Sequence, residues 1–261
     1  MPAPHLASLL LSVGLAASLA AGAAAQETER KVAAGEDPGQ LKGVVELFTS
    51  QGCASCPPAD AALKNLIEDG SVVALSYHVD YWNYLGWADT LATKQNTARQ
   101  YAYARMFGRN GVYTPQAVLN GRDHVNGGNL SGIRGKLDEM KQTGKGMRVP
   151  VGAARKGDEI DISIGAGDGK ANIVVVYFTR QQVVEVEKGE NSGKKISYFH
   201  AVRDIQTIGM WDGTPTRYVL PASVLDEQED SGCAVLVQKM KSTETPGAII
   251  GATTLLSAEA R

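Results

Sequence analysis

The chain has 261 residues, 43% of them hydrophobic and 21% charged, with 26 basic and 28 acidic residues and a formal net charge of −2. This balance provides no strongly basic surface, so we expect neither nucleic acid nor acidic lipid as a partner. After the first 25 residues, no apolar segment approaches the length of a membrane helix. The remaining chain, about 235 residues, is enough for one large or two ordinary domains.

Residues 1–25 are predicted to be an export signal. The run 6–20 is almost wholly apolar but too short to span a bilayer comfortably, and three alanines at 23–25 supply small residues for cleavage. No Lys or Arg precedes the run, which leaves a retained anchor as the alternative to cleavage. Residues 26–40 have no apolar period and are predicted to be a flexible leader. We therefore expect a periplasmic or secreted protein, in a compartment where cysteine pairs persist or cycle.

Two cysteines lie where a predicted strand passes into a predicted helix. Residues 44–48 are apolar, β-branched and aromatic, whereas residues 59–67 repeat apolar side chains at helical spacing. Cys53 and Cys56 fall between them, and Pro57 suits a first helical turn. A thiolate at a helix entrance faces unpaired backbone N–H groups and the positive end of the helix dipole, which lower its pKa.

Three interpretations of Cys53 and Cys56 are open from their spacing. They can form a structural disulfide, half of a metal site, or a redox pair in which Cys53 attacks and Cys56 resolves. A zinc site would need further cysteines or a histidine pair, and the only other cysteine is Cys233. The surrounding strand and helix favour the redox pair. Cys233 precedes the apolar stretch 234–237, where we expect it to be buried and free.

Residues 72–78 form the second predicted strand, apolar enough to be buried on both faces. His78 and Asp80 follow at its carboxyl end, where sites collect in open α/β sheets, so both side chains can reach the cysteines. The simpler interpretation is a structural histidine hydrogen-bonded to Asp80. An aromatic cluster at 81–87 either packs or walls a groove. Residues 88–107 are predicted to form a helix.

A second motif lies in residues 111–121, where an extended segment and the Thr114–Pro115 bond lead into a strand. Asn120 and Gly121 are the two residues typical of a hairpin turn, and they lead into a strand at 122–126. Beyond it, apolar residues repeat at helical spacing from 130 to 140 and predict another helix.

These motifs resemble the thioredoxin and glutaredoxin superfamily, in which a CxxC pair lies beside a cis proline that opens a strand pair. The resemblance covers residues 43–143 and implies that Thr114 and a cis Pro115 lie against the sulfur pair, with the Thr114 backbone pairing to substrate and the proline excluding metal. Six short motifs narrow this resemblance: FTSQGC (48–53), PPAD (57–60), HVDYW (78–82), LGW (85–87), VYTPQ (112–116) and GENSG (189–193). Through these motifs the chain is similar to the bacterial secreted thioredoxin-like family catalogued as domain of unknown function 1223.

Glu46 is a candidate for moving the proton of Cys56. The superfamily resemblance implies a buried acid on the strand before the cysteines, and Glu46 lies on that strand, although the link from it to Cys53 is longer than usual. Period-two alternation places Glu46 on the face opposite Val45 and Leu47, in the core or in solvent. If it is buried, its pKa rises and it can act as the base.

From residue 146 onward the pattern changes to strands alone, separated by glycine-rich turns. The predicted strands are 149–154, 160–164, 172–179, 183–188, 194–202, 217–220, 233–239 and 248–255. The predicted fold class is therefore an α/β thioredoxin-like domain with an inserted helix (41–145), followed by a β-rich, sandwich-like C-terminal module (146–261).

The leading functional prediction is an exported thiol-disulfide oxidoreductase that needs no cofactor or metal. Its partners would be a protein or small-molecule thiol or disulfide and an unidentified redox partner. The predicted site residues are Cys53, Cys56, Thr114 and Pro115, with Glu46, His78 and Asp80 as supporting candidates. Two alternatives stay open: a copper or other soft-metal carrier that uses the cysteines with His78, and a non-catalytic binding module whose disulfide is structural.

Overall fold

The structure is a computed structural model that describes residue 1 and residues 41–226, 230–242 and 245–257. The predicted signal (1–25) and leader (26–40) lie outside the described residues, Met1 excepted. Strands account for 45% of the described residues and helices for 21%. No helix of the described residues is long and apolar enough to cross a membrane.

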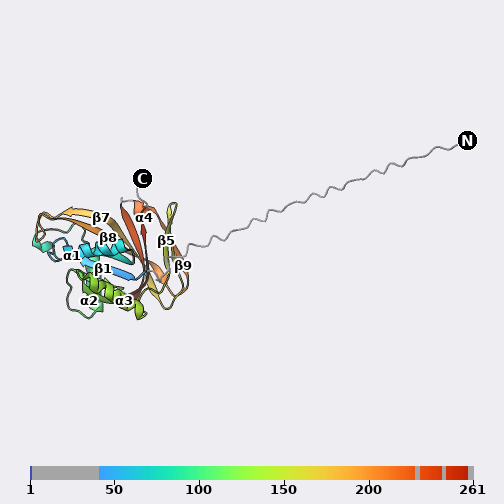
Figure 1. The fold of residues 1–261 in the computed structure, drawn as a ribbon, viewed down its shortest axis with the longest axis horizontal. Helices are drawn as coiled ribbons and strands as arrows, with labels where there is room; N and C mark the ends of the chain where they lie inside the picture. Colours follow the sequence, from blue (N-terminus) through green and yellow to red (C-terminus); the bar gives the residue numbers. More distant parts are fainter. Residues whose placement is uncertain (2–40, 227–229, 243–244, 258–261) are drawn as a thin grey trace. The chain divides into compact units, whose positions relative to one another are not determined.

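Figure 1 shows the described elements. The strands are β1 (Gly43–Thr49), β2 (Val72–His78), β3 (Gln116–Leu119), β4 (Asp123–Asn126), β5 (Val151–Lys156), β6 (Glu159–Ile164), β7 (Ala171–Glu185), β8 (Lys195–Trp211), β9 (Thr216–Pro221), β10 (Ser231–Ser242) and β11 (Thr245–Leu256). The helices are α1 (Pro57–Asp69), α2 (Lys94–Met106), α3 (Leu130–Gln142), α4 (Ser223–Asp226) and the short 3₁₀ helix η1 (Asn83–Leu85).

The predicted fold class, an α/β thioredoxin-like domain followed by a sandwich-like module, is wrong. The chain is mostly β, and one eight-stranded sheet, ordered β11-β10-β7-β8-β2-β1-β3-β4, contains strands from both sides of residue 145. Strand β2 pairs in parallel with β1, and with β8 through Ser76 and Ala201, while the other neighbours are antiparallel. The physical reason is the second edge of β2, whose backbone groups need partners that β8 supplies.

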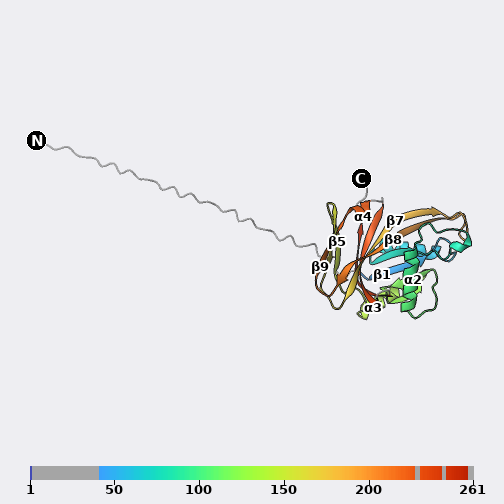
Figure 2. The same cartoon turned by 180° about the vertical axis from the view of Figure 1, so that it is seen from behind.

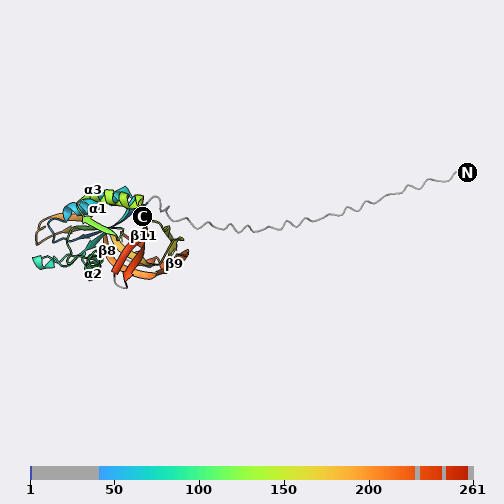
Figure 3. The same cartoon turned by 90° about the horizontal axis from the view of Figure 1, so that it is seen from below.

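Helices cover both faces of the β1–β2 part of this sheet. Helices α1 and α3 lie on one face and α2 on the other, as Figure 3 shows. Val45 and Leu47 of β1 pack in the cluster that holds the buried side chains of α1 and α3. Phe48 points to the opposite face, where Tyr103 of α2 lies with its ring centroid 6.2 Å away. Alternation along β1 therefore decides which side chains meet which helix.

The remaining strands form a three-stranded antiparallel sheet, β5-β6-β9. Its buried residues, among them Ile160 and Ile162, pack with Val175 of β7 and Val235 of β10 in one apolar cluster, and Figure 2 shows this end of the molecule from behind. The strands predicted at 172–179 and 183–188 are one strand, β7, because the residues between them keep pairing with β8.

Local signals set the ends of the helices. Helix α1 begins with the two prolines and ends at Gly70, whose φ of 68° suits a residue without a Cβ. The helix predicted over 88–107 is α2, which begins only at Lys94. The Thr93 hydroxyl caps it by accepting a hydrogen bond from the Asn96 N–H at 3.0 Å. The predicted hairpin turn is confirmed: Asn120 and Gly121, both with positive φ, join β3 to β4.

Candidate functional site

The cysteine pair lies in the turn between β1 and α1. Cys53 and Cys56 form a disulfide with their Cα atoms 5.4 Å apart. Cys56 is the N-terminal capping residue of α1, and its carbonyl accepts hydrogen bonds from the N–H groups of Ala59 and Asp60. Both cysteines are buried, with exposed fractions of 1% and 0%. The sequence therefore placed the pair correctly at the helix entrance but gave no sign that it is covered.

The Thr114–Pro115 loop lies beside the first turn of α1. Its peptide bond is cis, as the superfamily resemblance implies. Strand β3 starts directly after it and pairs with the end of β1. A Cβ atom at Gly127 would lie 3.2 Å from the Cβ atoms of both Ala59 and Pro115, so loop and helix meet there. The Trp82 indole N–H donates to the Thr114 hydroxyl at 2.7 Å, which ties the loop to the aromatic segment after β2.

His78 is completely buried at the end of β2, but its partner is not the predicted one. Its Nδ1 lies 2.9 Å from a carboxylate oxygen of Asp89, whereas Asp80 accepts a hydrogen bond from the Thr97 hydroxyl at 2.7 Å. The predicted His78–Asp80 bond is therefore wrong. Asp80 helps to hold α2, because Thr97 belongs to that helix.

Asp89 connects His78 to the cysteine turn, and sequence reasoning missed it. Its carboxylate accepts hydrogen bonds from the backbone N–H groups of Gln51, at 2.7 Å, and Leu91, at 2.9 Å. Burial alone would raise the pKa of Asp89, but the charge of His78 and these hydrogen bonds lower it overall. Only the chain fold brings residue 89 to this position, so no local pattern marks it.

A second missed acid, Asp60, lies one helical turn after Cys56. Its side chain is buried, one carboxyl oxygen accepts from the Thr49 hydroxyl at 2.8 Å, and the other has no hydrogen-bond partner among the described residues. Burial raises the pKa of Asp60 to about 7, although the neighbouring His78 lowers it. Helical spacing could have indicated this residue, since Cys56, Asp60 and Leu63 share one face of α1.

Two other buried atoms without hydrogen-bond partners in the described part of the chain belong to residues that interact electrostatically with Asp60. Among the described residues, His78 Nε2 and Tyr198 Oη are also buried without a hydrogen bond. The ring centroids of His78 and Tyr198 lie 4.6 Å apart. Burial is the largest cause of the raised pKa of Tyr198, and the charges of Asp60 and Asp89 raise that pKa further. Buried polar atoms without partners are uncommon in proteins and require an explanation such as proton exchange or a bound water.

Glu46 is buried but does not face the cysteines. It lies on the α2 face of the sheet, opposite Val45 and Leu47, which pack toward α1. Its carboxylate accepts from Arg99 Nε at 2.6 Å and from the Tyr103 hydroxyl. The structure thus gives Glu46 an ion pair on the far face of the sheet, and the buried acid one helical turn after Cys56 is Asp60.

The end of the β7–β8 hairpin covers the cysteine turn. The Asn191 side-chain amide donates to the carbonyl oxygens of Gln51 and Cys53, both at 2.9 Å. The Glu190 carboxylate accepts from the Ala54 N–H at 3.1 Å, and Lys194 Nζ holds the Asn191 carbonyl at 2.8 Å. The sequence indicated a turn here but not what the turn contacts.

Aromatic side chains border the same turn. The Trp87 indole N–H donates to the Gln51 side chain at 2.8 Å, and Trp82 stacks with Tyr84 at 6.3 Å. Tyr84 is 77% exposed, so this border offers apolar surface to solvent beside the disulfide. Among the described residues, no group of three or more His, Cys, Asp or Glu side chains is arranged to hold a metal ion. Cys233 is free and buried, as predicted, and burial raises the pKa of its thiol to about 12.

Comparison with known proteins gives a family and a fold. Residues 44–238 match the model of a family described as Protein of unknown function (DUF1223). A protein of Agrobacterium tumefaciens with a crystal structure is 59% identical, with a TM-score of 0.79 over 85% of this chain and 96% of its own. HBP35 of Porphyromonas gingivalis is 17% identical, with a TM-score of 0.55 over 82% and 75%, and is similar in fold alone. No curated protein matches.

Proposed function

Because the chain belongs to the DUF1223 family, whose description states no activity, we propose its function from its site: thiol–disulfide exchange through Cys53 and Cys56, in the periplasm or outside the cell. The observation that carries the proposal is the position of the pair at the entrance of α1, with the buried carboxyl of Asp60 one turn further along. A helix entrance stabilises a thiolate, and a carboxyl with a pKa near neutrality can exchange a proton with it.

In the oxidising direction, electrons pass from substrate thiols to the cysteine pair. A substrate thiolate attacks Cys53 Sγ, a new S–S bond forms, and the Cys53–Cys56 bond breaks. Cys56 leaves as a thiolate and takes the proton held by Asp60. A second substrate thiolate attacks the substrate sulfur of the mixed disulfide and releases Cys53. The substrate loses two electrons, the cysteine pair gains them, and the protons lost by the substrate thiols return through solvent. The reverse sequence reduces a substrate disulfide.

We also propose that the site is related to that of the thioredoxin superfamily. The support for this relationship is the juxtaposition of the CxxC turn and the Thr114–Pro115 loop, which meet beside Ala59. In this proposal the Thr114 backbone pairs with the substrate chain, and His78 and Asp89 hold the cysteine turn in place through Gln51. The relationship concerns the site, since the fold class is mostly β.

A second candidate is a binding protein in which the disulfide only fixes the turn. The observation that favours it is the complete burial of both sulfur-bearing residues beneath Asn191. Exchange catalysts keep their attacking thiol partly exposed, whereas structural cysteines are inert because they are buried. The aromatic surface that includes Trp82 and Tyr84 would then be the functional surface.

The deciding experiment measures the reduction potential of the pair against a glutathione series, with exchange rates on a peptide disulfide. Thiol exchange predicts a potential between about −120 and −270 mV and loss of exchange in both Cys53→Ser and Cys56→Ser. Cys233→Ala is the matched control, because it removes a cysteine outside the pair, and it should exchange at the wild-type rate. A potential below about −300 mV would reject catalysis in favour of the structural disulfide.

A further inference from the structure

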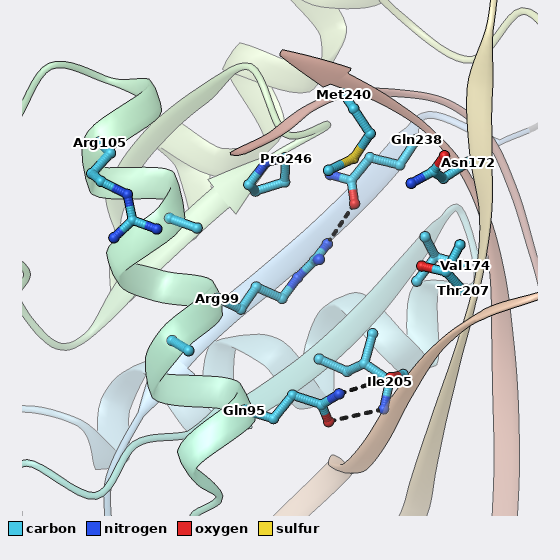
Figure 4. Close-up of a pocket in the computed structure, with 12 residues that line it drawn as sticks. Gln95, Arg99, Arg105, Asn172, Val174, Ile205, Thr207, Gln238, Met240 and Pro246 are labelled. Carbon is cyan, nitrogen blue, oxygen red and sulfur yellow. Dashed lines mark hydrogen bonds between the residues drawn. The ribbon is translucent and has the colours of Figure 1, made fainter. Parts of the chain in front are cut away.

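A cavity of about 410 Å³ lies between α2 and the β7, β8 and β10 strands, away from the cysteine turn. Figure 4 shows the residues that line it. They are Gln95, Ala98, Arg99, Ala102, Arg105, Asn172, Val174, Ile205, Thr207, Gln238, Met240 and Pro246. The volume lies within the range of small-molecule sites. Two of these residues are arginines and none is acidic, so the lining favours an anion over a cation.

Arg99 is fixed at the centre of the cavity wall. Its Nε donates to Glu46 at 2.6 Å, and its Nη2 donates to Gln238 at 2.9 Å and to the Tyr103 hydroxyl at 3.2 Å. The guanidinium carbon lies 5.6 and 5.2 Å from the ring centres of Tyr77 and Tyr103. These contacts hold the guanidinium in one orientation before any ligand arrives, which reduces the entropic cost of binding.

One nitrogen of this guanidinium, Nη1, takes no part in these hydrogen bonds. Nη1 has no hydrogen-bond partner among the described residues, and the Arg99 side chain is only 11% exposed. Glu46 already balances the charge of Arg99, so the net positive charge of the lining comes from Arg105, which is exposed on α2. Arg99 can thus donate hydrogen bonds inside the cavity, while Arg105 attracts an anion toward it.

The opposite wall is partly apolar. Val174, Ile205 and Met240 face the α2 side in Figure 4, and the amide of Asn172 adds a polar group near them. Bulges occur in both strand pairs that build this wall: the β7–β8 register shifts between Ile173 and Val174, and the β10–β11 register shifts on both sides of Gln238. Bulges redirect side chains and are enriched beside functional sites.

We propose that this cavity binds a small organic carboxylate with a short apolar chain. The carboxylate accepts hydrogen bonds from Arg99 Nη1, and the apolar chain lies against Val174, Ile205 and Met240. Arg105 contributes attraction from the rim. This function is independent of thiol exchange, because no residue of the cysteine turn lines the cavity.

The test is calorimetric titration of the oxidised protein with hexanoate, its neutral analogue hexanamide, and inorganic phosphate. Hexanoate should bind one molecule per chain and about tenfold more tightly than hexanamide, because only the carboxylate gains charge-assisted hydrogen bonds. Equal affinity for the amide would overturn the anion assignment. Phosphate binding as tightly as hexanoate would mean that the apolar wall contributes nothing.

Two variants locate the binding. Ala98→Trp fills the cavity from an exposed position on α2 and should abolish hexanoate binding. Arg105→Gln should weaken it by about threefold and make it less sensitive to salt, since a rim charge acts through a screened field. Arg109→Gln, an exposed arginine outside the cavity, is the matched control and should bind like the wild type. Unchanged affinity in Ala98→Trp, or equal losses in Arg105→Gln and Arg109→Gln, would place the ligand elsewhere.

Discussion

A carboxyl at position 60 is an unusual choice for the inner face of a helix. Burial opposes its ionisation, and of its neighbours Thr49 and His78 favour the ion while Asp89 opposes it. The outcome is a group that holds its proton until about neutral pH in the folded chain, whereas an unfolded Asp loses its proton near a pKa of 3.8. Such a group makes stability depend on pH through linkage.

We therefore expect the contribution of Asp60 to stability to fall as the pH rises from about 4 to about 7. In that window folded Asp60 binds a proton that the unfolded chain does not. Its contribution to the free energy of unfolding therefore falls as the pH rises, and the total fall across the window is on the order of 4 kcal/mol. Urea unfolding at about pH 5 and about pH 8, with the disulfide intact, measures this. Asp60→Asn should remove most of the difference, while Asp69→Asn, an exposed acid at the end of the same helix, should keep it. An unchanged slope in Asp60→Asn would contradict the assignment.

A second prediction concerns the buried ion pair between Glu46 and Arg99. Glu46 is completely buried and the Arg99 side chain is 11% exposed, so Glu46→Gln leaves a buried guanidinium without its counter-ion. We expect a loss of about 3–5 kcal/mol in the free energy of unfolding, measured in urea. Glu68→Gln breaks the exposed pair with Lys64 and should cost less than about 1 kcal/mol. Similar losses in the two variants would show that the buried pair is no more than a surface ion pair in energetic terms.

At the scale of elements, the β7–β8 hairpin joins distant parts of the chain. Its far end packs Val184, Val186 and Tyr198 against Trp87 and Leu91, and Figures 1 and 2 both place this end beside the segment that follows β2. The apolar contacts bring the hairpin end to the site, and the Asn191 amide then fixes the cysteine turn. Access to the disulfide therefore depends on an element far from it in sequence.

Asn191→Ala should speed reduction of the disulfide by a small-molecule dithiol. Two hydrogen bonds to the turn are lost, at roughly 0.5–1.5 kcal/mol each, so the uncovered state should gain about tenfold in population. Stopped-flow reduction followed by thiol labelling gives the rate. Ser192→Ala is the control, because its hydroxyl donates to the Glu187 carbonyl within the same loop and not to the cysteine turn. If both variants react at the wild-type rate, the hairpin end does not limit access.

The features of helices and turns that the sequence predicted correctly depend on neighbouring residues alone. The prolines after Cys56 and the Asn120–Gly121 turn act through their own backbone preferences, and both predictions are confirmed. The helix expected at 88–107 started too early, since the capping hydroxyl of Thr93 decides its first residue. Alternation assigned Glu46 to the face opposite Val45, but it could not identify Arg99 as the partner.

The sequence likewise indicated some residues of the candidate site and missed others. Cys53, Cys56 and the Thr114–Pro115 loop carry motif signals and lie together in the structure. Asp89 and Asn191 reach the turn only through the tertiary fold, and residues so far apart leave no periodic or spacing pattern. Asp60 had a usable signal in its helical face, which the general preference for acids in an exposed first turn concealed.

At the scale of the whole molecule, the eight-stranded sheet makes the two predicted parts interdependent. Strand β8 lies between β2 and β7, and the core beneath α2 combines Tyr77 with Val176, Phe178 and Leu236 from the C-terminal strands. The sequence could not foresee this, because strands that pair across a long separation look the same as strands that pair with near neighbours.

A fragment of residues 41–145 should therefore not fold alone. It lacks β8 along the edge of β2 and most of the apolar residues under α2, so its sheet would expose both backbone groups and a buried face. We expect poor dispersion in its amide NMR spectrum and no cooperative melting, against a dispersed spectrum for residues 41–261. A well-dispersed, cooperatively melting fragment would support the predicted boundary at 145.

The position of β8 in the sheet also determines when the β2 edge can be paired during synthesis of the chain. Strand β2 ends at His78 and β8 begins at Lys195, so a chain that folds as it is made leaves the β2 edge open while everything between is added. At about 5–20 residues per second, that wait is on the order of ten seconds, long enough for an open edge to meet another chain. A chain kept unfolded until it is complete avoids the wait, because β2 and β8 then become available together. The export signal predicted at residues 1–25 would impose such a delay.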